Sequence, residues 1–134
     1  MPKGIDSQSQ RDRLLAAVLT VALAGVIVTP LCGALFGCGC TWPWAGLDRH
    51  CNVHDPSDPA HCPWCVRPAV AALTFVAAAS LGASAAWALP RGRLRRWHAL
   101  LARTGVGLLV HALASTVGAA WIAHAAGYPH FLGG

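Results

Sequence analysis

The fold is decided by the stretch LLAAVLTVALAGVIVTPLCGALF at residues 14–36, in which no side chain is charged. About 20 consecutive, mostly apolar residues are enough for one helical crossing of a lipid bilayer. Alanine and leucine dominate this stretch, and it lacks the alternation of apolar and polar residues that is typical of strands. Residues 14–36 therefore predict a membrane-spanning helix.

Two further segments have the same character, residues 68–89 and 104–126, and the only titratable residues in them are His111 and His124. Of the 134 residues, 55% are hydrophobic and only 11% are charged, whereas about 25% of an average soluble domain is charged. We therefore expect a single all-α membrane domain over residues 1–134. Three transmembrane helices form it, with an irregular Cys/His-rich loop at residues 37–67 between the first two.

The positive residues predict the orientation of the helices. They are Lys3, Arg11 and Arg13 before the first helix, and Arg91, Arg93, Arg95 and Arg96 in the loop at residues 90–97. Short loops rich in Lys and Arg stay in the cytoplasm, so we expect the N-terminus and this basic loop inside and the Cys/His loop outside. The aromatic residues expected at the outer interface are Trp42, Trp44, Trp64, Trp121 and Tyr128.

The net charge of +5 is explained by this topology, and we expect the lipid bilayer, not nucleic acid, as the partner of the basic residues. The chain has nine Arg, one Lys and no Glu, together with many Ala. Such a composition is typical of a bacterial genome of high GC content, which predicts a bacterial inner membrane.

Residues 37–65 contain five of the six cysteines and three of the seven histidines. The candidate metal ligands in this stretch are Cys38, Cys40, Cys51, His54, Cys62 and Cys65. Zinc prefers four nitrogen and sulfur ligands in a tetrahedron, and thiolate-rich sites also select copper(I). The spacing therefore predicts a copper or zinc site, with His50 and His61 in reserve. Cys32 is expected at the membrane surface, facing lipid or the loop.

Two alternatives remain open for the same cysteines. Cys62 and Cys65 form a Cys-x-x-Cys pair, the usual reversible dithiol, just before Arg67 and a helix start, which are features that lower a thiol pKa. The arrangement resembles the disulfide-oxidising membrane proteins that use quinone, which have four membrane helices and a second cysteine-bearing loop. The resemblance implies a quinone-linked thiol–disulfide oxidoreductase. Static disulfides that staple a docking loop are the other alternative, because thiols outside the cytoplasm are oxidised.

A metal-binding role is favoured over an enzymatic one, because the sequence has no catalytic triad and no phosphate-binding glycine motif. Little of the chain is expected outside the bilayer. We therefore expect protein partners, with this chain as an accessory or assembly subunit of a larger membrane complex.

Overall fold

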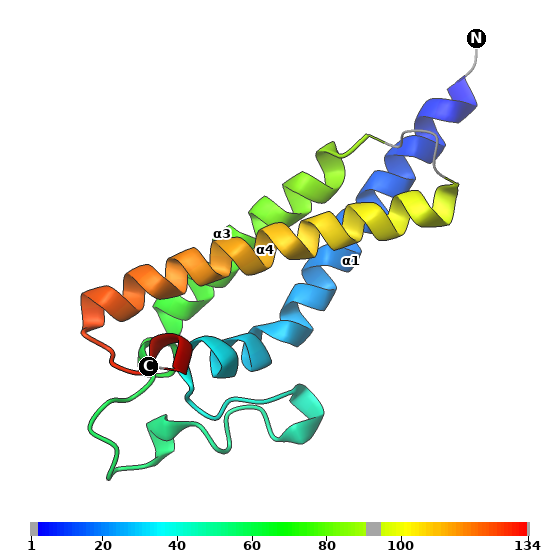
Figure 1. Ribbon diagram of the computed structural model, residues 1–134. Helices are drawn as coiled ribbons and strands as arrows, with labels where there is room; N and C mark the ends of the chain where they lie inside the picture. Colours follow the sequence, from blue (N-terminus) through cyan, green and yellow to red (C-terminus); the bar gives the residue numbers. More distant parts are fainter. Residues whose placement is uncertain (1–2, 91–94, 134) are drawn as a thin grey trace.

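The computed structural model describes residues 3–90 and 95–133, and every regular element in this part of the chain is helical. Three long helices, α1 (Lys3–Phe36), α3 (Pro68–Ala88) and α4 (Arg96–Ala126), form a bundle (Figure 1). The short elements are η1 (Pro43–Ala45), η2 (Asn52–His54), α2 (Pro63–Val66) and η3 (Phe131–Gly133). The three long helices are long and apolar enough to cross a membrane, which confirms the prediction of an all-helical membrane-type fold.

Two of the helices extend beyond the apolar segments from which they were predicted. Helix α1 begins at Lys3 instead of about residue 14, and α4 begins at Arg96 instead of about residue 104. The backbone hydrogen bonds of a helix are made within the segment itself, so polar residues continue it past the apolar part. Hydropathy marks the apolar part alone.

Helix α1 contains Pro30, six residues before its end at Phe36. A proline inside a helix removes one backbone hydrogen bond and is a common cause of a kink. The last turns of α1, drawn in cyan, run in a different direction from the rest of the helix (Figure 1). Cys32 lies in this redirected segment, at the end of the bundle where residues 37–62 are located.

Small residues line the contacts between the long helices. The spacing of Ala78, Gly82 and Ala86 predicts that one face of α3 packs closely, and all three residues are buried. A methyl group added to Gly82 would lie 2.5 Å from the carbonyl oxygen of Gly107 in α4. One added to Gly107 would lie 2.6 Å from the hydroxyl of Thr20 in α1. All three helices therefore approach one another closely here, as small residues allow in membrane proteins.

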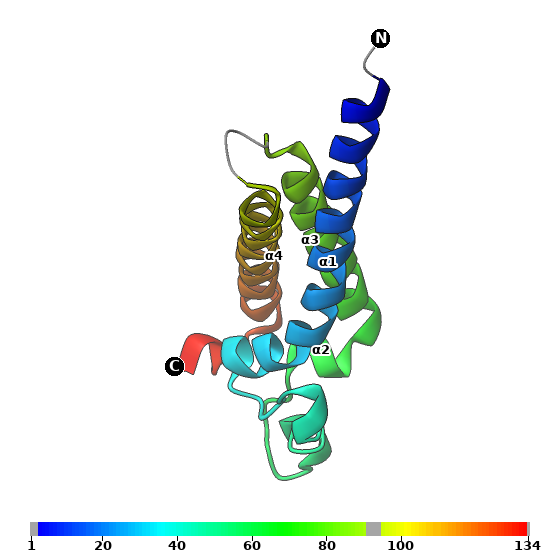
Figure 2. The same ribbon diagram turned by 90° about the vertical axis from the view of Figure 1, so that its right-hand side faces the viewer.

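Polar contacts join the helices at the end of the bundle where the chain begins. The buried carboxylate of Asp12 accepts hydrogen bonds from Arg96, with its Oδ1 2.9 Å from Nη2 and 3.0 Å from Nε. Arg13 donates a hydrogen bond of 3.2 Å to the carbonyl of Trp87. Residues 91–94 of the predicted basic loop lie outside the described residues. The loop at residues 37–62 projects from the opposite end of the bundle in both views (Figures 1 and 2).

Candidate metal centre

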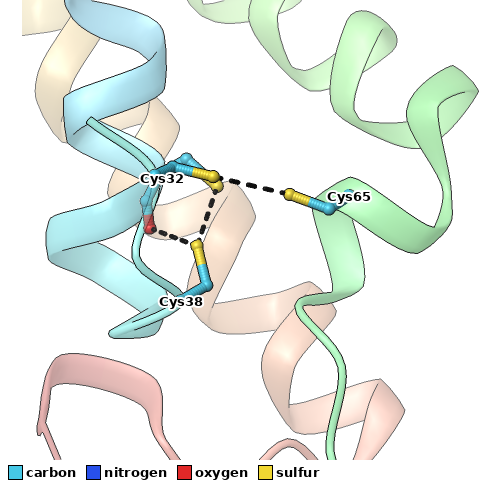
Figure 3. A group of neighbouring side chains, drawn as sticks. Cys32, Cys38 and Cys65 are labelled. Carbon is cyan, nitrogen blue, oxygen red and sulfur yellow. Dashed lines mark hydrogen bonds between the residues drawn. The ribbon is translucent and has the colours of Figure 1, made fainter. Parts of the chain in front are cut away.

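All six cysteine side chains of the chain gather at the end of the bundle that carries the loop. The sulfur atoms of Cys32, Cys38, Cys40 and Cys65 lie within 4.8 Å of one another. Cys51 is 2% exposed and Cys62 is fully buried, and both contact this group. Figure 3 shows the thiols of Cys32, Cys38 and Cys65 directed toward one another from α1, from the chain after it and from α2. We call these six side chains the thiol cluster.

Four sulfur–sulfur contacts describe the geometry of the thiol cluster. They are 3.7 Å for Cys32–Cys38, 3.6 Å for Cys32–Cys62, 3.7 Å for Cys40–Cys65 and 3.2 Å for Cys51–Cys65. All six thiols are free. Zinc–sulfur bonds of about 2.3 Å in a tetrahedron place neighbouring sulfurs about 3.8 Å apart. Within the group of four, the contacts Cys32–Cys38 and Cys40–Cys65 are close to that value and every other sulfur pair lies within 4.8 Å, so these donors suit a tetrahedral thiolate site.

Two glycines bring the first cysteines together. Gly33, one residue after Cys32, lies so close to the loop that an added methyl group would overlap the carbonyl oxygen of Cys40. Gly39 has a φ of +87°, in the left-handed region that favours glycine. A methyl group at Gly39 would overlap the carbonyl oxygen of His50. The chain therefore folds back tightly against α1, and this turn places the thiols of Cys38 and Cys40 beside that of Cys32.

Asn52 positions two of the cysteines through hydrogen bonds. Its backbone N–H donates to the carbonyl of Cys38 at 2.8 Å, and its side-chain oxygen accepts from the backbone N–H of Cys62 at 2.9 Å. Its side-chain nitrogen donates to the carbonyl of Ala60 at 2.8 Å. A single residue, through its backbone and its side chain, thus connects the middle of the loop to the segments that carry Cys38 and Cys62.

Aromatic side chains pack in the same buried cluster as the cysteines. The ring of Phe36 makes edge-to-face contacts with Trp64, Tyr128 and Phe131, with centroids 5.3, 5.7 and 5.8 Å away. The hydroxyl of Tyr128 donates a hydrogen bond of 2.8 Å to the carbonyl of Phe36. Burial raises the pKa of Tyr128 to about 12, so the hydroxyl stays protonated at neutral pH. Trp64 and Tyr128, which the sequence predicts at the outer interface, are buried around Phe36.

Replacing Tyr128 by Phe is expected to lower the free energy of unfolding by about 1–3 kcal/mol, because the buried carbonyl of Phe36 loses its donor while the ring packing is kept. Thermal unfolding of the purified protein in detergent measures the effect. Phe131→Leu, which keeps the backbone bonds and removes a ring contact, serves as the comparison. A melting temperature of Tyr128→Phe equal to that of the wild type would contradict the role of the hydroxyl.

The histidines of the loop do not join the thiol cluster. His54, a predicted ligand, is exposed, and its Nε2 lies 3.3 Å from a carboxylate oxygen of Asp48. His61 makes a 2.8 Å hydrogen bond from Nδ1 to the carbonyl of Asn52, and His50 is exposed. The structure therefore brings together the other five predicted ligands and adds Cys32, which was predicted at the membrane surface. Pro30 was the available signal for Cys32, because a kink redirects the turn that carries this cysteine.

The thiols differ in how readily they ionise. Hydrogen bonds from neighbouring thiols, that of Cys32 above all, lower the pKa of Cys38. Burial raises the pKa of Cys51 to about 12. The thiolate is the form of cysteine that binds metals, and a lowered pKa favours that form at Cys38. The raised pKa of Cys51 favours its neutral thiol at neutral pH.

The donor set consists of soft thiols within mutual contact, drawn from α1, the loop and α2. Such a set can bind a thiophilic metal ion, or it can form disulfides if two thiols are oxidised. Comparison of the chain with protein-family models, with curated proteins and with solved structures finds no match.

Proposed function

We propose that this protein is an integral membrane protein that holds a thiophilic metal ion, zinc or copper(I), in its thiol cluster. The proposal is supported above all by the four sulfurs of Cys32, Cys38, Cys40 and Cys65, which converge within 4.8 Å. Thiolates at this spacing suit the tetrahedral sites of zinc, and soft ligands also select copper(I). The burial of the site and the tight turns around it favour a closed site that retains its ion.

We further propose that the thiol cluster faces the outside of a bacterial inner membrane, with the N-terminus in the cytoplasm. The positive residues at the opposite end of the bundle support this orientation. The exposed loop offers a surface for a protein partner, since the rings of Trp42 and Trp44 stack with centroids 5.2 Å apart and Trp44 is 75% exposed. Tryptophan is enriched in the residues that dominate binding at protein interfaces. These features support an accessory or assembly subunit of a membrane complex.

The contact between Cys51 and Cys65 favours thiol–disulfide exchange as a second candidate function. At 3.2 Å it is the shortest of the four sulfur contacts. Oxidation would join the two sulfurs and release two protons and two electrons, which a quinone in the membrane would accept to become a quinol. Cys65 also belongs to the Cys-x-x-Cys pair for which the sequence predicts this chemistry.

Metal content and thiol reactivity, measured together, test the proposed function. Protein purified in mild detergent without chelator is expected to contain zinc or copper, with its thiols protected from alkylation until a chelator removes the metal. Cys38→Ser is expected to lose the bound metal, and His54→Ala, which changes a residue paired with Asp48, is expected to keep it. Protein without metal, whose thiols react only after reduction, would contradict metal binding and support disulfide chemistry.

A further inference from the structure

We propose that the thiol cluster holds two divalent ions that share the thiolates of Cys38 and Cys65. This inference rests on the proposed metal-binding function and extends it. One tetrahedral ion uses four sulfurs, and the chain has gathered six. The other two cysteines also contact sulfurs of the group of four. Cys51 lies 3.2 Å from Cys65, and Cys62 lies 3.6 Å from Cys32.

The short contacts divide the six sulfurs into two sets of three. Cys32 contacts Cys38 and Cys62, and Cys65 contacts Cys40 and Cys51. None of these four contacts crosses from one set to the other. Each set therefore provides three ligands for one ion, and each ion needs one more sulfur to complete a tetrahedron.

The fourth ligand of each ion comes from the other set. Cys65 lies within 4.8 Å of both Cys32 and Cys38, and Cys38 lies within 4.8 Å of both Cys40 and Cys65. Two four-coordinate ions that share two ligands need six sulfurs in all, which is the number present. One ion then binds Cys32, Cys62, Cys38 and Cys65, and the other binds Cys40, Cys51, Cys38 and Cys65.

The two shared ligands come from different elements of the fold. Cys38 belongs to the turn after α1 and Cys65 to the short helix α2, whereas the unshared pairs are Cys32 with Cys62 and Cys40 with Cys51. Cys65 is the one partly exposed thiol of the six. An ion that enters from outside would therefore meet a shared ligand first.

The stoichiometry of zinc binding tests the two-ion arrangement. The reduced, chelator-washed full-length protein is titrated with zinc in detergent, and bound zinc is counted by native mass spectrometry. The wild type is expected to bind two equivalents, Cys51→Ser and Cys62→Ser one each, and the control His54→Ala two. Cys65→Ser, which removes a shared ligand, is expected to weaken the binding of both ions.

The outcomes separate this inference from the proposed function. One equivalent in the wild type, unchanged in Cys51→Ser and Cys62→Ser, would overturn the two-ion arrangement and leave a single four-thiol site. No bound zinc in the reduced wild type would overturn the two-ion arrangement, and the proposed function would fail with it if copper(I) also does not bind.

A second measurement, on the wild type alone, avoids variants that fail to fold. With ¹¹³Cd in place of zinc, two nuclear magnetic resonance signals that couple through shared thiolates are expected, and a single signal would overturn the arrangement.

Discussion

Gly33→Ala is expected to weaken zinc binding by between about 5-fold and 150-fold. The added methyl group would overlap the carbonyl oxygen of Cys40 and would lie 3.0 Å from its carbonyl carbon. Both atoms belong to the backbone, so the clash is relieved only if the loop moves away from α1. That movement separates Cys40 from Cys32. Overpacking of this kind costs about 1–3 kcal/mol, and each 1.4 kcal/mol is a factor of about ten in affinity.

Gly25→Ala provides the matched control for this variant, because it makes the same change in the same helix. Among the residues that the structure describes, a methyl group at Gly25 meets no atom within 4 Å. Both substitutions gain the same intrinsic helix propensity, about 1 kcal/mol for alanine over glycine, so their difference isolates the contact with Cys40. Zinc affinity is measured by competition with a chelator of known affinity. Equal zinc affinities for the two variants would show that zinc binding does not depend on the close approach of the loop to α1.

Gly107→Ala is expected to lower the free energy of unfolding by about 1–3 kcal/mol and to leave the number of bound metal ions unchanged. Its methyl group would lie 2.6 Å from the hydroxyl of Thr20 and 2.8 Å from the carbonyl oxygen of Gly82. The three long helices would have to separate at this point. The cysteines come from α1, the loop and α2, at the far end of the bundle from Asp12 and Arg96, so the thiol cluster should keep its ligands.

Gly105→Ala is the control for the bundle, since a methyl group there meets no atom of residues 3–90 and 95–133 within 4 Å. Thermal unfolding in detergent and metal content are measured on both variants. We expect a lower melting temperature for Gly107→Ala than for Gly105→Ala. A loss of metal from Gly107→Ala at temperatures where it remains folded would contradict the separation of bundle stability from the site.

The helices could be predicted from the sequence because a membrane span needs only length and apolar composition, which residues 14–36 display directly. The gathering of cysteines in the loop was visible in the same way. The set of metal ligands was harder to predict, because spacing along the chain does not show which side chains point inward. His54 has the spacing of a ligand, yet it lies on an exposed turn beside Asp48. Cys32 lies within a predicted helix, so the sequence does not indicate that it contacts the loop. Its contact with Cys38 depends on the direction of the last turns of α1 and on the close approach of Gly33 to Cys40.

The role of the C-terminal segment was also hidden in the sequence. Tyrosine is enriched at membrane–water interfaces, so the sequence predicts Tyr128 at the outer interface. Its hydroxyl contacts the carbonyl of Phe36, 92 positions earlier in the chain. A hydrogen bond between residues so far apart requires the three helices to be packed first, and no local pattern reports it.

The bond between Tyr128 and Phe36 sets an order of events during synthesis. All six cysteines precede this tyrosine in the chain, so a ribosome adds every thiol before it adds Tyr128. The hydrogen bond from Tyr128 to Phe36 and the contact between their rings can form only after α4 has been made. The packing around Phe36 is therefore completed only after the whole thiol cluster has been synthesised.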